Sequence, residues 1–290
     1  MKSGKMLILM GIAGLFLMNS CSQVGAEKDI ISVSILPQKY FVEKIAGDKF
    51  TVNVLVPAGA SPETYEISPG QMRMLAKSRY LFITGHLSFE QAWKDRIQKL
   101  NKDLKISDLS RGIDLLETEH RHDDHFHRGI DPHIWISPGT VSIMADNIFE
   151  TFANSDPENY EYYRTGYELF KEEIFRADSL LGNLFAERTN RAFLIFHPSL
   201  GYLARDYDLE QIALEYEGKS PPPAYIMKII DIAREKNIKA VLIQKEFNID
   251  NAKSIAREID GEIIRIDPLA GEWYEEIIRT GQVLHNVFGE

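Results

Sequence analysis

The 290-residue chain has a single cysteine, Cys21, and fewer basic than acidic side chains. One cysteine excludes a framework of intrachain disulfides. The 33 Lys and Arg residues against 43 Asp and Glu residues give a net charge of −10. This charge argues against a nucleic-acid partner, which selects a basic face, and it favours the attraction of small cations. A hydrophobic share of 44% and a charged share of 26% are those of an ordinary globular protein.

The start of the chain lacks an apolar run long enough to span a membrane, which takes about 20 residues. Residues 6–18 are apolar and follow two lysines without an acidic residue, a pattern that predicts a signal peptide over residues 1–20. The segment MNSC that ends at Cys21 resembles the processing site of bacterial lipoproteins. The resemblance implies a lipidated Cys21, a tether over 21–28, and a protein anchored to a bacterial membrane that faces the periplasm or the cell exterior. A plain signal peptide followed by a stray thiol is the alternative.

Short β-rich segments alternate with amphipathic segments along most of the chain. This alternation predicts parallel sheets with helices on their faces, in which ligands bind at the carboxyl ends of the strands. The predicted strands are 30–36, 51–56, 80–83, 104–106, 193–196, 240–243 and 263–266, and the predicted helices include 39–46, 69–77 and 225–235.

The middle of the chain predicts one long helix over residues 157–186. Asp156, Pro157 and Glu158 form a favourable helix start, and apolar residues then recur in alternating steps of three and four. At about 1.5 Å per residue such a helix is about 45 Å long. We interpret it as a strut between two α/β lobes of a monomer. A coiled-coil dimer is the less favoured alternative, because the pattern covers only about four heptads.

Half of the eight histidines lie close together in one acidic segment. His120, His122, His125 and His127 stand among aspartates and glutamates without apolar periodicity. This composition predicts a solvated loop over 117–128 that collects metal ions through imidazole and carboxylate groups. A charged loop that is merely rich in histidine is the alternative.

Four residues of metal-binding type occur at widely separated points, in loops or after predicted strands. They are Glu63 in SPETYE, His133 in DPHIW, His197 in FHPSLGY and Asp267 in RIDPL, separated by 70, 64 and 70 residues. A site assembled from such distant points is expected to lie between the two lobes.

With these motifs the chain resembles the metal-specific solute-binding proteins of ABC importers, the zinc and manganese group with a rigid linking helix. The segments DPHIW and FHPSLGYLARDY carry the resemblance. The lipoprotein-type start, the histidine-rich segment, DPENY at 156–160 and DPL at 267–269 support it and follow in the expected order. The resemblance implies that His133 and His197 are metal ligands and that Asp267 is a carboxylate ligand. It also implies a membrane permease of the ABC type as the partner.

The first ligand position departs from the pattern of that group. The group usually has a histidine between the proline and the Tyr-Glu pair, where this chain has Glu63. A carboxylate can bind zinc or manganese, but two imidazoles and two carboxylates are a harder donor set than three imidazoles. The oxygen content favours Mn²⁺ or Fe²⁺ more than is usual in the group, whereas His197 and the histidine-rich segment favour zinc. We expect Zn²⁺ as the bound ion, with Mn²⁺ or Fe²⁺ as the alternative.

The implied fold is α/β, with two Rossmann-like lobes over 29–142 and 189–290, linking helices over 143–188, and the metal site in the cleft between the lobes. The implied function is high-affinity capture of extracytoplasmic Zn²⁺ and delivery to the permease, without catalysis. A metal-buffering adhesin lipoprotein of the same fold is one alternative. A surface zinc hydrolase is another; it needs an open position for water and a carboxylate base, and no His-Glu-x-x-His segment occurs in the sequence.

Overall fold

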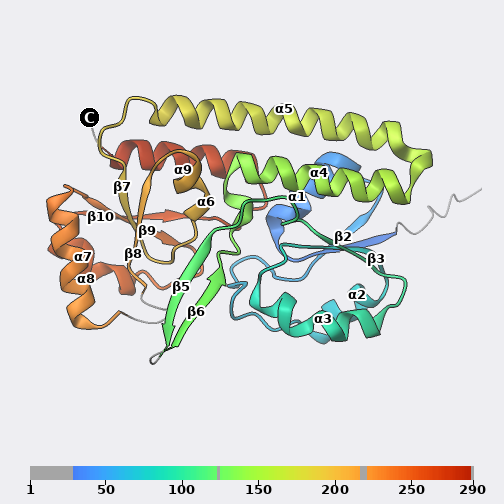
Figure 1. The fold of residues 1–290 in the computed structure, drawn as a ribbon, viewed down its shortest axis with the longest axis horizontal. Helices are drawn as coiled ribbons and strands as arrows, with labels where there is room; N and C mark the ends of the chain where they lie inside the picture. Colours follow the sequence, from blue (N-terminus) through green and yellow to red (C-terminus); the bar gives the residue numbers. More distant parts are fainter. Residues whose placement is uncertain (1–28, 123–124, 216–220, 289–290) are drawn as a thin grey trace, which may run out of the picture.

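The computed structural model describes residues 29–122, 125–215 and 221–288, which form two α/β lobes bridged by long helices (Figure 1). Each lobe has a four-stranded parallel sheet, with the strand orders β2-β1-β3-β4 and β10-β9-β7-β8. The predicted two-lobe architecture is therefore confirmed. The predicted signal peptide, tether and lipidated Cys21 lie outside the described residues and stay predictions.

The first lobe is built from short strands alternating with helices. In β1 the three residues after Ile30 are fully buried, as expected for a strand at the centre of a sheet covered on both faces. The strands are β1 (Ile30–Val33), β2 (Thr51–Val54), β3 (Ser78–Ile83) and β4 (Lys105–Asp108), and the helices are α1 (Leu36–Ala46), α2 (Pro69–Ala76) and α3 (Ser88–Leu100).

The second lobe repeats this alternation. Every residue of its two inner strands, β7 and β9, is buried, whereas the edge strand β8 is short and half polar, so its sequence does not predict a strand. The strands are β7 (Ala192–Ile195), β8 (Glu210–Ala213), β9 (Ala240–Gln244) and β10 (Glu262–Ile266), and the helices are α6 (Gly201–Asp206), α7 (Pro223–Glu235), α8 (Asp250–Glu258) and α9 (Trp273–Val287).

The predicted long helix is present. It consists of a one-turn 3₁₀ helix, η2 (Pro157–Asn159), followed by α5 (Tyr160–Phe185), and it comes after α4 (Pro138–Ser155). Helix α5 contacts α1 of the first lobe and α9 of the second, so it runs across both lobes (Figure 1). The predicted apolar stripe supplies all but one of its buried residues, Phe185 being the exception; the others are Tyr163, Phe170, Ile174, Ala177 and Leu181.

The prediction of a loop over 117–128 is wrong for the backbone. Strands β5 (Glu117–His122) and β6 (His125–Ile130) form an antiparallel hairpin that pairs His120 with His127 and His122 with His125. The sequence conceals this hairpin because apolar periodicity reports burial against a core, and backbone pairing between two strands needs none. The side chains of the four histidines lie outside the described residues, so their collecting role stays a prediction.

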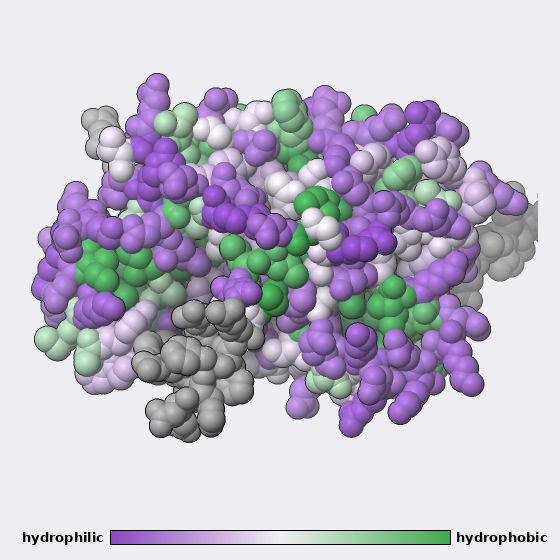
Figure 2. Space-filling view, in the orientation of Figure 1, coloured by the Kyte–Doolittle hydropathy of each residue, from purple (hydrophilic) through white to green (hydrophobic). Residues whose placement is uncertain are grey.

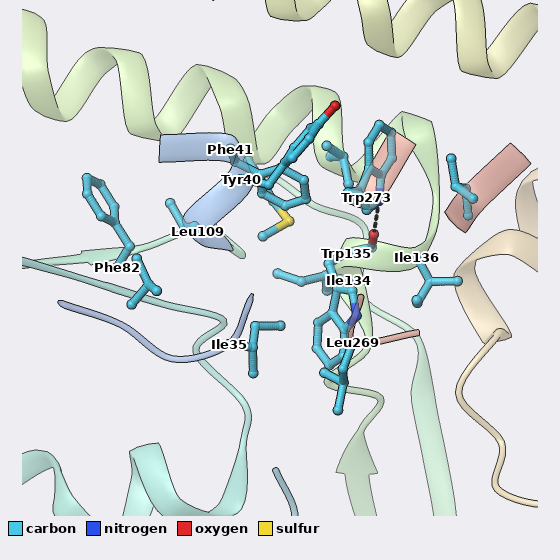
Figure 3. Packing of buried hydrophobic residues seen from close by; sticks show 14 of the residues in the cluster. Ile35, Tyr40, Phe41, Phe82, Leu109, Ile134, Trp135, Ile136, Leu269 and Trp273 are labelled. Carbon is cyan, nitrogen blue, oxygen red and sulfur yellow. Dashed lines mark hydrogen bonds between the residues drawn. The ribbon is translucent and has the colours of Figure 1, made fainter. Parts of the chain in front are cut away.

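Two tryptophans lie in the larger of the two hydrophobic clusters, which contains residues of both lobes (Figure 3). The indole Nε1 of Trp273 in α9 donates to the carbonyl of Trp135 at 2.7 Å, the bond drawn as a dashed line. Trp135 lies in the 3₁₀ helix η1 (Ile134–Ile136), and its own Nε1 donates to the carbonyl of Pro268 at 2.8 Å. Both indoles are buried, so breaking either bond leaves an unpaired polar group in the core. This connection restricts the motion of one lobe against the other.

The face shown in Figure 2 is largely hydrophilic, with small apolar areas scattered over it. None of the helices among the described residues is long and apolar enough to cross a membrane.

Two glycines of α5 have contrasting surroundings. A Cβ atom at Gly166 would lie 2.5 Å from the carbonyl oxygen of Ile45 and 2.7 Å from that of Lys44, so α5 meets the end of α1 backbone to backbone. A Cβ atom at Gly182 would have nothing within 4 Å. Only the first glycine is required by packing.

We expect Gly166→Ala to lower the free energy of unfolding by about 1–3 kcal/mol, because the added methyl group pushes the α1 backbone away from α5. The matched change Gly182→Ala should raise it by up to about 1 kcal/mol, because alanine is the better helix former and its methyl group has room. Urea denaturation of the two variants measures both effects. Equal effects from the two substitutions would contradict the close approach at Gly166.

Candidate metal centre

Three of the four predicted ligands meet between the lobes. One ligand atom from each of Glu63, His133 and His197 lies within 4.8 Å of the other two. The Nε2 atom of His197 is 3.2 Å from Oε1 of Glu63 and 3.4 Å from Nε2 of His133. These residues line a cavity together with Glu246 and Leu269, among others.

The backbone positions follow from the local sequence. His197 comes two residues after the buried strand β7, at the carboxyl end of its sheet, where parallel sheets bind ligands. His133 stands just before η1, and Glu63 lies in the turn segment between β2 and α2. The side chains of His133 and His197 are each 10% exposed, whereas the Glu63 side chain is 38% exposed, so the carboxylate is on the solvent side of the cluster.

Asp131 fixes the orientation of the His133 ring. Its Oδ1 accepts from the backbone N–H of His133 at 2.9 Å and lies 2.7 Å from the ring Nδ1. A carboxylate at Nδ1 favours the tautomer with a proton there and leaves Nε2 free to bind a cation. The aspartate of DPHIW therefore positions the ring of a predicted ligand, a contact that its place next to Pro132-His133 in the sequence does not establish.

Glu215 plays the same part for His197. Its Oε2 lies 2.5 Å from Nδ1 of His197, and the side chain of Gln244 donates to the His197 carbonyl at 2.6 Å. The Phe247 ring stacks on the imidazole with a centroid separation of 5.5 Å. Sequence reasoning missed Glu215, Gln244 and Phe247, because no motif links them to His197 and only the fold brings the three segments together.

The charges around His197 favour its protonated form. Burial lowers the pKa of His197, but the hydrogen bonds and charges of Glu215 and Glu63 outweigh burial and raise that pKa to about 10. A cation that binds Nε2 must displace this proton. The cluster thus has the electrostatic character of a cation site, because two carboxylates stabilise positive charge on or beside the imidazole.

Asp267, the fourth predicted ligand, is not part of this three-residue cluster. It follows β10, its backbone N–H donates to Glu276 at 2.8 Å, and its Oδ2 lies 2.5 Å from the ammonium of Lys245. It lines a neighbouring cavity, and Pro268 lines both. Asp267 is therefore next to the site but is engaged by a basic side chain.

Glu246 adds a carboxylate that the sequence does not single out. It lines the same cavity as His133 and His197. Burial raises the pKa of Glu246 and the charge of Asp267 raises it further, while the two histidines lower it. The cavity therefore has more acidic groups around it than the four predicted ligands provide.

Two imidazole nitrogens and a carboxylate oxygen that converge from distant segments are a donor set for a borderline divalent cation such as zinc. Comparison with known proteins gives the family. The sequence model of ZnuA, described as zinc-uptake complex component A, periplasmic, matches residues 31–280. The chain belongs to the ZnuA family.

Solved structures and characterised relatives agree with this family. A crystal structure of ZnuA is 36% identical, with a TM-score of 0.84 over 90% of this chain and 100% of that one. The high-affinity zinc uptake system protein ZnuA of Bacillus subtilis is 26% identical over 85% of this chain and 80% of its own length. The zinc-binding lipoprotein AdcA of Streptococcus pneumoniae is 22% identical over 91% of this chain and 54% of its own length. The ZnuA family consists of periplasmic zinc-uptake components, so zinc uptake is the process to which this chain belongs.

Glu215→Gln should weaken zinc binding by about 10–100-fold, because the neutral amide holds the His197 ring less firmly and makes it a weaker donor. Glu210→Gln is the matched control: Glu210 lies in β8 of the same sheet and pairs with the exposed Lys236 on the surface. Competition titration against a chromophoric zinc chelator measures both affinities. Equal affinities in the two variants would show that Glu215 does not position the ligand.

Proposed function

We propose that the mature protein captures Zn²⁺ outside the cytoplasm and delivers it to an ABC-type membrane permease. The observation that supports this most strongly is the pair of Nε2 atoms of His133 and His197, 3.4 Å apart with Glu63 beside them. Each ring is oriented by a carboxylate at its Nδ1. Membership in a zinc-uptake family makes zinc the expected cargo.

In this proposal Glu63, His133 and His197 form the primary ligand set. Asp267 becomes a fourth ligand only when its ion pair with Lys245 opens. The set joins His133 of the first lobe to His197 of the second, so the ion itself links the lobes. A small separation of the lobes is then enough to break the coordination and release the ion.

The way in which the ion is released depends on how rigidly the two lobes are held together. Helix α5 spans both lobes, and the Trp135–Trp273 bond joins them beside the site. We propose that docking on the permease supplies the energy for the small motion that releases the ion. The lipid on Cys21 holds the monomeric protein at the membrane near that partner. The role is binding and release, with no catalytic step.

His133→Ala should weaken zinc binding by at least about 100-fold, or about 2.7 kcal/mol, because the site loses one of its two imidazoles. The control is His86→Ala, which removes a histidine of the same lobe that does not line the cavity. Isothermal titration of the mature protein with Zn²⁺ measures both. Tight binding that survives in His133→Ala would refute the assigned site.

The four histidines of the β5–β6 hairpin are tested by replacing them together, as His120→Gln, His122→Gln, His125→Gln and His127→Gln. Glutamine keeps the length of the hairpin and removes the imidazoles. We expect fewer zinc ions bound per chain, with one tight site unchanged, in equilibrium dialysis. Loss of the tight site in this variant would contradict the division between a collecting segment and a cleft site.

A further inference from the structure

Residues 244–247, which are the last residue of β9 and the three after it, lie beside the metal centre, although no sequence motif marks them. Gln244 holds the His197 carbonyl, Lys245 pairs with Asp267, Glu246 lines the cavity, and Phe247 stacks on His197. Three of these contacts support or line the site. Lys245 alone brings a positive charge to a place built to hold a cation.

The two side chains of the Lys245–Asp267 ion pair differ in their exposure to solvent. The lysine side chain is 60% exposed, whereas the aspartate side chain is 19% exposed. The Asp267 backbone is held on both sides, since its N–H donates to Glu276 and its carbonyl accepts from Ala270 at 2.9 Å. Lys245 therefore reaches in from the solvent to an aspartate whose position is already fixed.

An ammonium 2.5 Å from a carboxylate oxygen competes with a metal ion for that oxygen. While the pair is closed, the cation is offered the two imidazoles and Glu63. When it opens, the carboxylate of Asp267 becomes available in addition to those of Glu63 and Glu246 that already line the cavity. The ion pair between Lys245 and Asp267 thus decides how many carboxylate oxygens are available to the bound ion.

We propose that Lys245 withholds Asp267 from the bound ion and so sets the preference of the site for zinc over manganese. The inference rests on the proposed function. Zinc binds well to few ligands that include imidazole, whereas manganese gains less from imidazole and more from carboxylate oxygen. A site deprived of the Asp267 carboxylate therefore disfavours manganese more than it disfavours zinc.

The test is Lys245→Met, which keeps the length of the side chain and removes the ammonium. We expect the affinity for Mn²⁺ to rise about tenfold more than the affinity for Zn²⁺, because the freed oxygen suits the harder ion. Titrations of the mature protein with each ion give the ratio of the two dissociation constants. Lys245→Arg should keep the parental ratio, since a guanidinium can also hold the carboxylate.

Two further variants separate this effect from the loss of one positive charge. Lys253→Met breaks a pair of equal length with Asp250 on the exposed face of α8, and it should leave the ratio unchanged. Lys245→Met combined with Asp267→Asn should return to the parental ratio, because the oxygen that the first change frees is then no longer a charged ligand. A shifted ratio that persists in the double variant would overturn the proposal, as would an unchanged ratio in Lys245→Met.

X-ray absorption at the metal edge gives a second readout that does not depend on affinity. The manganese-loaded Lys245→Met protein should show one more oxygen ligand than the manganese-loaded parent, and equal coordination would refute the inference. The proposed function fails separately, if the parent binds zinc weakly or if His133→Ala still binds it tightly. If the parent binds zinc tightly but Lys245→Met leaves the ratio of the two dissociation constants unchanged, the proposed function stands and only the role of Lys245 is refuted.

Discussion

Two imidazole nitrogens from different lobes face each other at 3.4 Å, and the rest of the site is arranged around this constraint. Two ring nitrogens at that distance need a proton or a cation between or beside them, because two lone pairs repel. The carboxylates of Asp131 and Glu215 hold the other nitrogen of each ring, and Glu63 adds negative charge on the solvent side. The result is a site that favours positive charge before any ion arrives.

The frame that keeps these nitrogens together is mostly apolar. Helix α5 lays its buried stripe across both lobes, and at Gly166 it approaches α1 so closely that no side chain fits. Near the site itself the indoles of Trp135 and Trp273 connect η1, α9 and the segment after β10 (Figure 3). Because these contacts are buried, the lobes cannot separate widely without exposing core, and a small change at the site is the favoured motion.

Much of the fold could be predicted because its elements carry strong periodic or apolar signals. Along α5, apolar residues recur every three or four positions, and β7 and β9 are apolar runs that prove to be buried. Both patterns are visible in the sequence. Strand β8 was missed because it is a short edge strand and half polar, and the β5–β6 hairpin was missed because backbone pairing between two strands needs no apolar periodicity. The polar partners of the site were missed for another reason: Glu215 and Glu246 are ordinary acidic residues until the fold brings them to His197 and the cavity.

The amino-acid sequence by itself determined that distant residues of metal-binding type lie in loops and at strand ends of an α/β protein, because strand, turn and ligand chemistry are local properties. It named Glu63, His133 and His197, which the fold brings together, and Asp267, which the fold places beside Lys245. Only the tertiary structure decided which carboxylates orient the rings and which one is engaged by an ammonium. Such choices depend on distances of a few ångströms between segments far apart in the chain, and sequence spacing contains no information about them.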